Sequence, residues 1–174
     1  MFTFVTGGLR SGKSEYALRR ASEHGPPPWL YVAAHIDGDD ELKARLANHR
    51  RDHDTTWKLI EAPEKLITAL DPAMLADCGA AVIDRFTVWL SRRLAATEKD
   101  SDRDLLNEVE ALADRLYRSP TPAVVVTTEI GLGFLPANVP DRRLINIAGK
   151  ANQILSERAE SVVLMVSGVP LRLR

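Results

Sequence analysis

The strongest chemical signal lies near the start of the chain, in the segment GGLRSGKS (7–14). It fits the pattern G-x-x-x-x-G-K-[ST], in which a loop of backbone amides wraps the phosphates of a nucleotide. Gly7 and Gly12 leave room for the backbone to approach phosphate oxygens, Lys13 would reach the β- and γ-phosphates, and the Ser14 hydroxyl would bind Mg²⁺. A plain glycine-rich turn is the alternative. The apolar run before the loop and the helical EYALRRASEH after it favour the phosphate loop.

A second candidate is Asp84, which ends the apolar run AAVID (80–84). A phosphate loop needs a carboxylate on a neighbouring strand to hold the metal's water shell opposite the serine hydroxyl. The alternative is that Asp84 only caps a helix beginning near Phe86. Beside a phosphate loop the metal role is favoured. No glycine of the chain lies three residues after an aspartate, so the D-x-x-G motif of GTPases is absent and a small-molecule kinase or nucleotidyl transferase is favoured.

Histidine and arginine are concentrated in the segment RLANHRRDH (45–53). His49 and His53 are four residues apart and could share a metal on one helix face, but Arg50 stands where H-E-x-x-H has glutamate. A solvated basic helix face is a second interpretation. In the third, His49 attacks a phosphorus, because neighbouring guanidinium groups neutralise the charge that develops on the phosphate oxygens.

These residues need elements that bring them to one edge of a sheet. Short apolar runs rich in β-branched residues alternate with segments of helical periodicity. Most runs are continuously apolar, which is typical of parallel strands buried on both faces. We therefore predict an α/β fold of the P-loop NTPase type, with three layers and a mainly parallel central sheet. The expected strands are 2–5, 29–34, 57–62, 80–84, 122–128 and 161–166, and the expected helices are 12–23, 39–53, 86–96, 101–118 and 141–159.

The composition limits the class of protein and of partner. The 174 residues carry 23 Lys+Arg and 24 Asp+Glu, a net charge of -1, so no overall basic field is available to bind nucleic acid. The hydrophobic fraction of 45% and the charged fraction of 27% are ordinary for a globular protein. Cys78 is the only cysteine, which excludes an internal disulfide. We expect one domain over residues 1–174 and a cytoplasmic location. We also expect no membrane insertion, because no run approaches the ~20 apolar residues of a span.

Several motifs, in their order and spacing, resemble those of the bifunctional cobinamide kinase/cobinamide-phosphate guanylyltransferase family of cobalamin biosynthesis. The phosphate loop is shared by very many proteins. More specific are RLANHRRDH with Trp57 and Glu61 behind it, TTEIGLGFLP, and IAGKANQ. The motifs YVAAH and AVIDR fall between them, so the resemblance covers nearly the whole chain.

The resemblance implies two reactions on one corrinoid. Adenosylcobinamide is phosphorylated on its aminopropanol hydroxyl with ATP or GTP, and GMP is then transferred from GTP to give adenosyl-GDP-cobinamide. It also implies a homotrimer and a histidine that becomes guanylylated, which His49 matches. Lys13 is the second expected catalytic residue, and Ser14 and Asp84 are the expected Mg²⁺ ligands. The expected nucleotide-binding positions are Gly7, Gly8, Leu9, Arg10, Ser11, Gly12, Lys13, Ser14, Ala33, Ala34, His35, Arg50, Arg51, Asp52, His53, Glu61 and Asp84.

The chain departs from the family pattern at three positions. Asn48 replaces a second histidine that some members have, Thr128 stands where asparagine is frequent, and Asn146 stands where aspartate is expected. Glu129 either positions substrate or metal at a strand end, or is a buried carboxylate paired with an arginine. Two other functions stay open: a P-loop kinase of a small alcohol without a covalent intermediate, and a non-catalytic nucleotide-binding regulator.

Overall fold

The computed structural model describes residues 1–33, 57–61, 64–96, 102–132 and 139–174. Its centre is a seven-stranded sheet in the order β3-β2-β4-β5-β1-β6-β7. Every strand pairing is parallel except that of β6 with β7. The strands are β1 (Phe2–Gly7), β2 (Trp29–Ala33), β3 (Trp57–Glu61), β4 (Ala80–Asp84), β5 (Ala123–Val126), β6 (Ser161–Val166) and β7 (Val169–Arg172).

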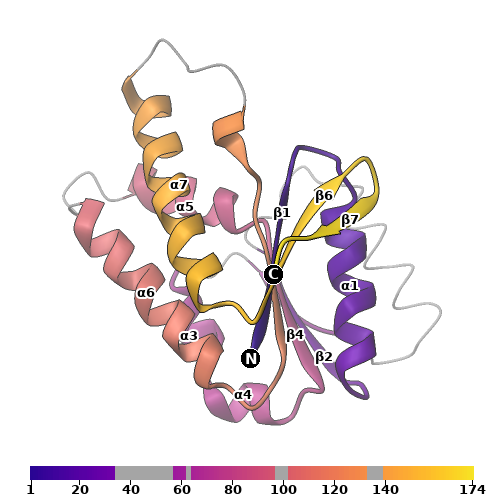
Figure 1. Cartoon of the computed structure of the whole chain (residues 1–174). Coiled ribbons are helices and arrows are strands. Elements are labelled where there is room, and N and C mark those ends of the chain that lie inside the picture. Colours follow the sequence, from indigo (N-terminus) through magenta and orange to yellow (C-terminus); the bar gives the residue numbers. More distant parts are fainter. Residues whose placement is uncertain (34–56, 62–63, 97–101, 133–138) are drawn as a thin grey trace.

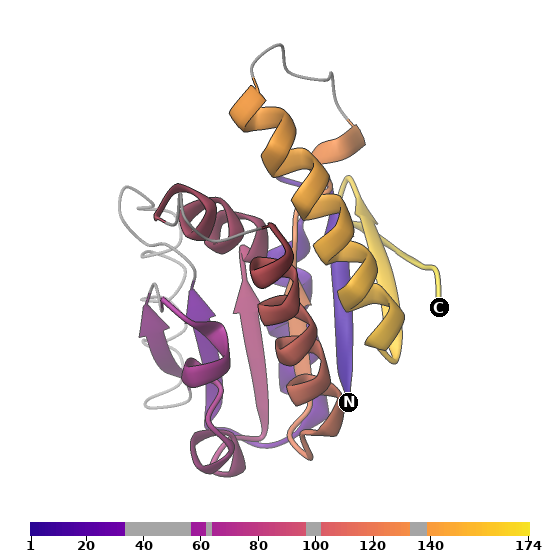
Figure 2. The same ribbon diagram turned by 90° about the vertical axis from the view of Figure 1, so that its left-hand side faces the viewer.

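Helices cover both faces of this sheet, which gives three layers (Figure 1). Helix α1 covers one face, and helices α5, α6 and α7 lie on the other, where Figure 2 shows them crossing in front of the strands. The helices are α1 (Lys13–His24), α3 (Leu66–Ala69), α4 (Pro72–Ala76), α5 (Phe86–Ala96), α6 (Asp102–Arg118) and α7 (Val139–Arg158), with a 3-10 turn η1 (Ile130–Leu132).

None of the helices within the described ranges is both long enough and apolar enough to cross a bilayer.

Alternate residues of the central strands supply two separate apolar cores. Phe4 and Ile83 are buried in the core beneath α5, α6 and α7, whereas Val5 and Val82 are buried in the core beneath α1. Each central strand is therefore apolar on both faces, which is why its residues form a continuous apolar run. The predicted fold class is confirmed.

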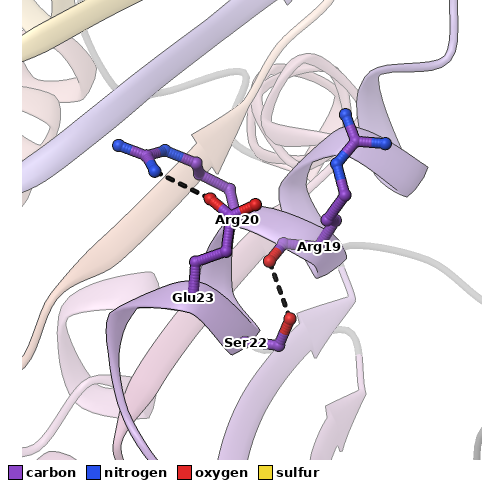
Figure 3. Close-up of polar contacts among 4 residues, drawn as sticks. All are labelled: Arg19, Arg20, Ser22 and Glu23. Atoms are coloured by element: carbon purple, nitrogen blue, oxygen red, sulfur yellow. Dashed lines mark hydrogen bonds and ion pairs between the residues drawn. The ribbon is translucent and has the colours of Figure 1, made fainter.

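Helix α1 turns one apolar face to the sheet and carries charge on the other. Ala17 and Ala21 are fully buried against the strands. On the opposite face an Arg20 nitrogen, Nη1, donates to Glu23 Oε2 at 2.8 Å, and the Ser22 hydroxyl donates to the carbonyl of Arg19 at 2.7 Å (Figure 3). A surface ion pair between helical residues three positions apart contributes only about 0.2–0.5 kcal/mol. Burial of the apolar face is thus the main stabilising contribution of α1.

Within the described residues the predicted elements agree with the observed ones to within a few residues, and the structure adds the 3-10 turn η1 and three other short elements. Strand β7 is an exposed edge strand of four residues, and α3 and α4 have four and five residues. Asp71 caps α4, because its Oδ1 accepts a hydrogen bond from the Ala73 amide at 2.8 Å. The helix expected over residues 39–53 lies outside the described residues.

Candidate active site

The phosphate loop leaves the end of β1 and enters α1 through backbone conformations that favour glycine. Gly7 has a φ of 147° and Gly12 a φ of 89°. Gly12 is the N-cap of α1, and no side chain caps this helix. The amides of its first turn therefore have no capping side chain as a partner, and they carry the positive end of the helix dipole. This is the arrangement that binds phosphate at a helix N-terminus.

The loop rests against the turn between β6 and β7 (Figure 1). The Gly168 amide donates to the carbonyl of Ser11 at 3.0 Å. A Cβ at Gly7 would lie 2.4 Å from the carbonyl oxygen of Met165, so only glycine fits there. The Ser11 hydroxyl is buried and has no hydrogen-bond partner among the described residues. Buried hydroxyls are normally paired, so a bound anion could complete the hydrogen bonding of this loop.

Lys13 places its amine inside the loop. Its Nζ donates to the carbonyl oxygen of Gly7 at 3.1 Å and to that of Gly8. Burial lowers the pKa of Lys13, and the nearby charge of Asp84 opposes that shift. The ammonium thus has neutral acceptors and one more distant carboxylate around it. Phosphate oxygens in the loop would replace those carbonyls with stronger, charged acceptors.

Asp84 is fixed so that its carboxylate faces the start of α1. Its Oδ1 accepts from the Ser14 hydroxyl at 3.2 Å and from the Arg85 amide at 2.9 Å, and its Oδ2 accepts from the hydroxyl of Tyr31. None of the described amides in the first turn of α5 bonds to this carboxylate, so the Asp84 side chain does not cap α5. The hydroxyl and carboxylate oxygens are hard donors of the type that Mg²⁺ prefers, so the donor set fits that ion.

Strand register brings further predicted residues to the same edge of the sheet. Ala33 pairs with Glu61 on one side and with Asp84 on the other. The ends of β3, β2 and β4 therefore form one row at the carboxyl edge, where ligands bind in open α/β sheets. The remaining predicted site residues lie outside the described ranges; they are Ala34, His35, His49, Arg50, Arg51, Asp52 and His53.

Two parts of this region are not evident from the sequence. Tyr31 lies inside an apolar strand, and nothing in its sequence context indicates that its hydroxyl bonds to Asp84. A buried polar cluster of Thr6, Thr87, Thr127 and Asn152 also adjoins the loop. The sequence indicates only Thr127 and Asn152 of this cluster, through the motifs TTEIGLGFLP and IAGKANQ. In the described ranges no three His, Cys, Asp or Glu side chains gather into a metal site.

This arrangement is that of a P-loop NTPase-type protein, because a phosphate loop follows β1, a carboxylate ends β4, and β5 lies between these two strands. Two solved structures share this fold. One is a KaiC-like protein from Pyrococcus horikoshii, with a TM-score of 0.57, 14% identity, and coverage of 94% of this chain and 69% of that one. The other is an ATPase of a bacterial type III secretion system, with a TM-score of 0.56, 13% identity, and coverage of 94% and 50%.

The sequence places the chain within this class. Residues 3–173 match the family described as cobinamide kinase / cobinamide phosphate guanyltransferase, and the chain belongs to that family. It is 35% identical over 175 residues to the bifunctional adenosylcobalamin biosynthesis protein CobP of Pseudomonas aeruginosa, covering 100% of this chain and 98% of that protein. It is 33% identical over 184 residues to CobU of Salmonella typhimurium, covering 100% of both. The recognition from the motifs is confirmed, and the chain is an enzyme of this kinase and guanylyltransferase type.

Proposed function

We propose that one phosphate loop serves both reactions of this chain. ATP or GTP phosphorylates the aminopropanol hydroxyl of adenosylcobinamide, and GMP then passes from GTP through a guanylylated His49 to the new phosphate. The observation that carries the proposal is the convergence of Lys13, Ser14 and Asp84 on the N-terminus of α1. The motif G-x-x-x-x-G-K-[ST] occurs once in the sequence, and end-to-end similarity to bifunctional relatives supports two activities.

The residues of the loop would act on the triphosphate in both reactions. The free amides of α1 and the Lys13 ammonium bind the phosphate oxygens and neutralise the negative charge that leaves with the diphosphate or pyrophosphate. Ser14 and Asp84 are the residues that would hold Mg²⁺. When bound, that ion supplies charge neutralisation on the phosphate oxygens. Tyr31 keeps the Asp84 carboxylate oriented toward Ser14.

The nucleophile of the guanylyl transfer would be His49, which lies outside the described residues. His49 belongs to the connection that leaves β2 at Ala33, and Ala33 pairs with Asp84. That connection therefore begins beside the candidate metal site. A neutral imidazole can attack the α-phosphorus of GTP without a general base, and the bond to the pyrophosphate oxygen breaks. The phosphate of the corrinoid then attacks the same phosphorus, takes GMP, and restores the imidazole.

Intact-mass spectrometry tests this function directly. After incubation with GTP and Mg²⁺, the protein is expected to gain the mass of one GMP unit, and adding adenosylcobinamide phosphate should remove that gain. A protein that phosphorylates adenosylcobinamide without ever forming the adduct would instead be a kinase without a covalent intermediate. Nucleotide binding without turnover of any corrinoid would indicate a regulator.

The homotrimer is part of the same proposal. Strand β7 forms an open edge of the sheet, and the β6–β7 hairpin exposes Val166, Val169, Leu171 and Leu173. Exposed apolar edge strands tend to be covered by another chain. Light scattering is expected to give the mass of three chains, and Leu171→Asp should reduce it. A monomeric wild-type protein would contradict this part of the proposal.

A further inference from the structure

Glu129 lies against the phosphate loop, although no role for it follows from the nucleotide site described above. Its backbone amide donates to the carbonyl oxygen of Gly7 at 3.1 Å. The same oxygen accepts the Lys13 ammonium at 3.1 Å. Glu129 follows β5, and β5 lies between the loop strand β1 and the Asp84 strand β4. The residue is therefore next to the place where the terminal phosphate of a nucleotide would lie.

The carboxylate of Glu129 is held by one of its two oxygens. Oε2 accepts from the Thr6 hydroxyl at 3.2 Å and from Asn152 Nδ2 at 3.3 Å. Oε1 accepts no hydrogen bond from any of the described residues. Glu129 is only half-buried, so this oxygen is not enclosed by protein without a partner. The carboxylate is thus oriented at one oxygen and able to accept a ligand's hydrogen bond at the other.

Buried groups fix the donors that hold Glu129. Asn152 Oδ1 accepts from the Thr127 hydroxyl at 3.0 Å, which sets the direction of the amide and turns Nδ2 toward Glu129. The Thr127 hydroxyl lies 2.8 Å from that of Thr87, whose Oγ1 also accepts from the Thr128 amide at 3.0 Å. Such a satisfied network restricts the carboxylate to one orientation.

The ligand that Glu129 would take follows from its charge. All its donors are neutral, and no Lys or Arg among the described residues pairs with it, so the ion-pair alternative has no support there. A carboxylate beside a triphosphate is repelled unless it accepts a hydrogen bond or a proton. Ionised phosphate oxygens have no proton to donate to Oε1. A hydroxyl group that approaches the terminal phosphate can donate to Oε1 and lie beside the phosphate without charge repulsion.

We propose that Glu129 binds the alcohol that receives the phosphoryl group, through Oε1, and accepts its proton; this rests on the kinase half of the proposed function. The alcohol oxygen forms a bond to the γ-phosphorus. The bond from that phosphorus to the bridging oxygen breaks, and its electron pair leaves with the nucleoside diphosphate. The hydroxyl proton moves to the Glu129 carboxylate.

The two reactions make different demands on such a base. In the kinase reaction the acceptor is an alcohol, which must lose its proton as the new bond forms. In the guanylyl transfer the acceptor is a phosphate monoester, which has largely lost its second proton at neutral pH because that pKa is about 6. Loss of the Glu129 carboxylate is therefore expected to impair the first reaction selectively.

Glu129→Gln tests this with the full chain, because glutamine has the same shape and its side-chain oxygen can still accept from Thr6 and Asn152. Phosphorylation of adenosylcobinamide is measured with γ-labelled nucleotide, and GMP transfer is measured separately from prepared adenosylcobinamide phosphate. The kinase kcat is expected to fall by about 100-fold or more. KM for the nucleotide and the rate of GMP transfer should change less than about threefold. Glu110→Gln, on the exposed face of α6, is the matched control and should leave both rates unchanged.

Each contrary result has a distinct meaning. An active wild type whose kinase rate survives Glu129→Gln overturns the role of Glu129 and leaves the proposed function standing. An equal loss of both reactions would show that Glu129 acts on the shared nucleotide. A higher Mg²⁺ requirement in Glu129→Gln would show that Glu129 helps to bind the metal. A lower unfolding midpoint would show that Glu129 stabilises the fold. A wild type that does not phosphorylate adenosylcobinamide contradicts the kinase function itself, and the role of Glu129 with it.

Discussion

Lys13 is a buried cation that donates to neutral carbonyls. Its replacement should change the rates of both reactions without changing the stability of the fold. We expect Lys13→Ala to lower both reactions together, by about 100-fold or more, because each loses a positive charge from the departing phosphates. Burial lowers the pKa of Lys13, which means that the charged amine opposes folding at neutral pH. Replacing Lys13 relieves this penalty but also removes the hydrogen bonds to the carbonyls of Gly7 and Gly8, so the denaturation midpoint without nucleotide should stay close to that of the wild type. Near wild-type GTP binding and turnover would contradict the phosphate-loop assignment.

Asp84 offers a second test at the same scale. Asp84→Asn keeps the shape of the side chain but removes its charge, so the fold and much of the nucleotide affinity should persist while both rates fall by about 100-fold or more. The Mg²⁺ concentration needed for half-maximal rate should rise. Tyr31→Phe is the matched control, since it removes one hydrogen bond to Asp84 and leaves the carboxylate, and its effect should be much smaller. A rate unchanged by Asp84→Asn would leave Asp84 with only its structural hydrogen bonds.

A site residue could be predicted from the sequence where its chemistry requires a fixed spacing from its neighbours in the chain. Lys13 and Ser14 could be proposed from the sequence because a phosphate loop must place them directly after Gly12. Asp84 could be proposed because it ends an apolar run. Tyr31 and Asn152 could not be assigned, because their partners come from other elements and only the folded sheet brings these groups together.

At the scale of elements, the loop depends on how closely β1 approaches β6. A Cβ at Gly7 would collide with the Met165 carbonyl, and the φ of 147° disfavours any other residue. Gly7→Ala is expected to lower the free energy of unfolding by about 2–3 kcal/mol. Gly8→Ala is the matched control, because a Cβ there meets nothing within 4 Å, and it should cost less than about 0.5 kcal/mol. Chemical denaturation without nucleotide measures both, and equal midpoints would contradict the packing argument.

Elements were predictable where their pattern was long enough to show a period. Strands such as β4, buried on both faces, appear as continuous apolar runs, and α6 repeats its buried leucines at helical spacing. Helices α3 and α4 are too short to show such a period. Strand β7 is exposed throughout, so no burial pattern marks it. Its place is set by the turn at Gly168, whose φ of 84° reverses the chain after β6.

At the scale of the whole molecule, the sheet gathers at one edge residues that the sequence spreads over more than half of the chain. Gly7, Ala33, Asp84 and Glu129 follow or end different strands, and their common edge results from the parallel order of β2, β4, β5 and β1. The order of strands could not be predicted from periodicity, because every central strand carries the same apolar pattern. Similarity to bifunctional relatives along the entire chain was recognisable from the motifs themselves.

Only one of the two proposed reactions, the GMP transfer, is expected to need His49. Incubation with GTP labelled at the α-phosphate should label the protein in an acid-labile, base-stable form, because a phosphoramidate has that stability. His49→Ala should abolish the label and the GMP transfer and retain phosphorylation of adenosylcobinamide, since that step needs the phosphate loop and no covalent intermediate on the protein. His53→Ala, four residues further on in the sequence, is the matched control and should keep the label. Label that survives His49→Ala and disappears in His53→Ala would assign the nucleophile to the second histidine, and loss of kinase activity in His49→Ala would mean that the reactions are not separable in this way.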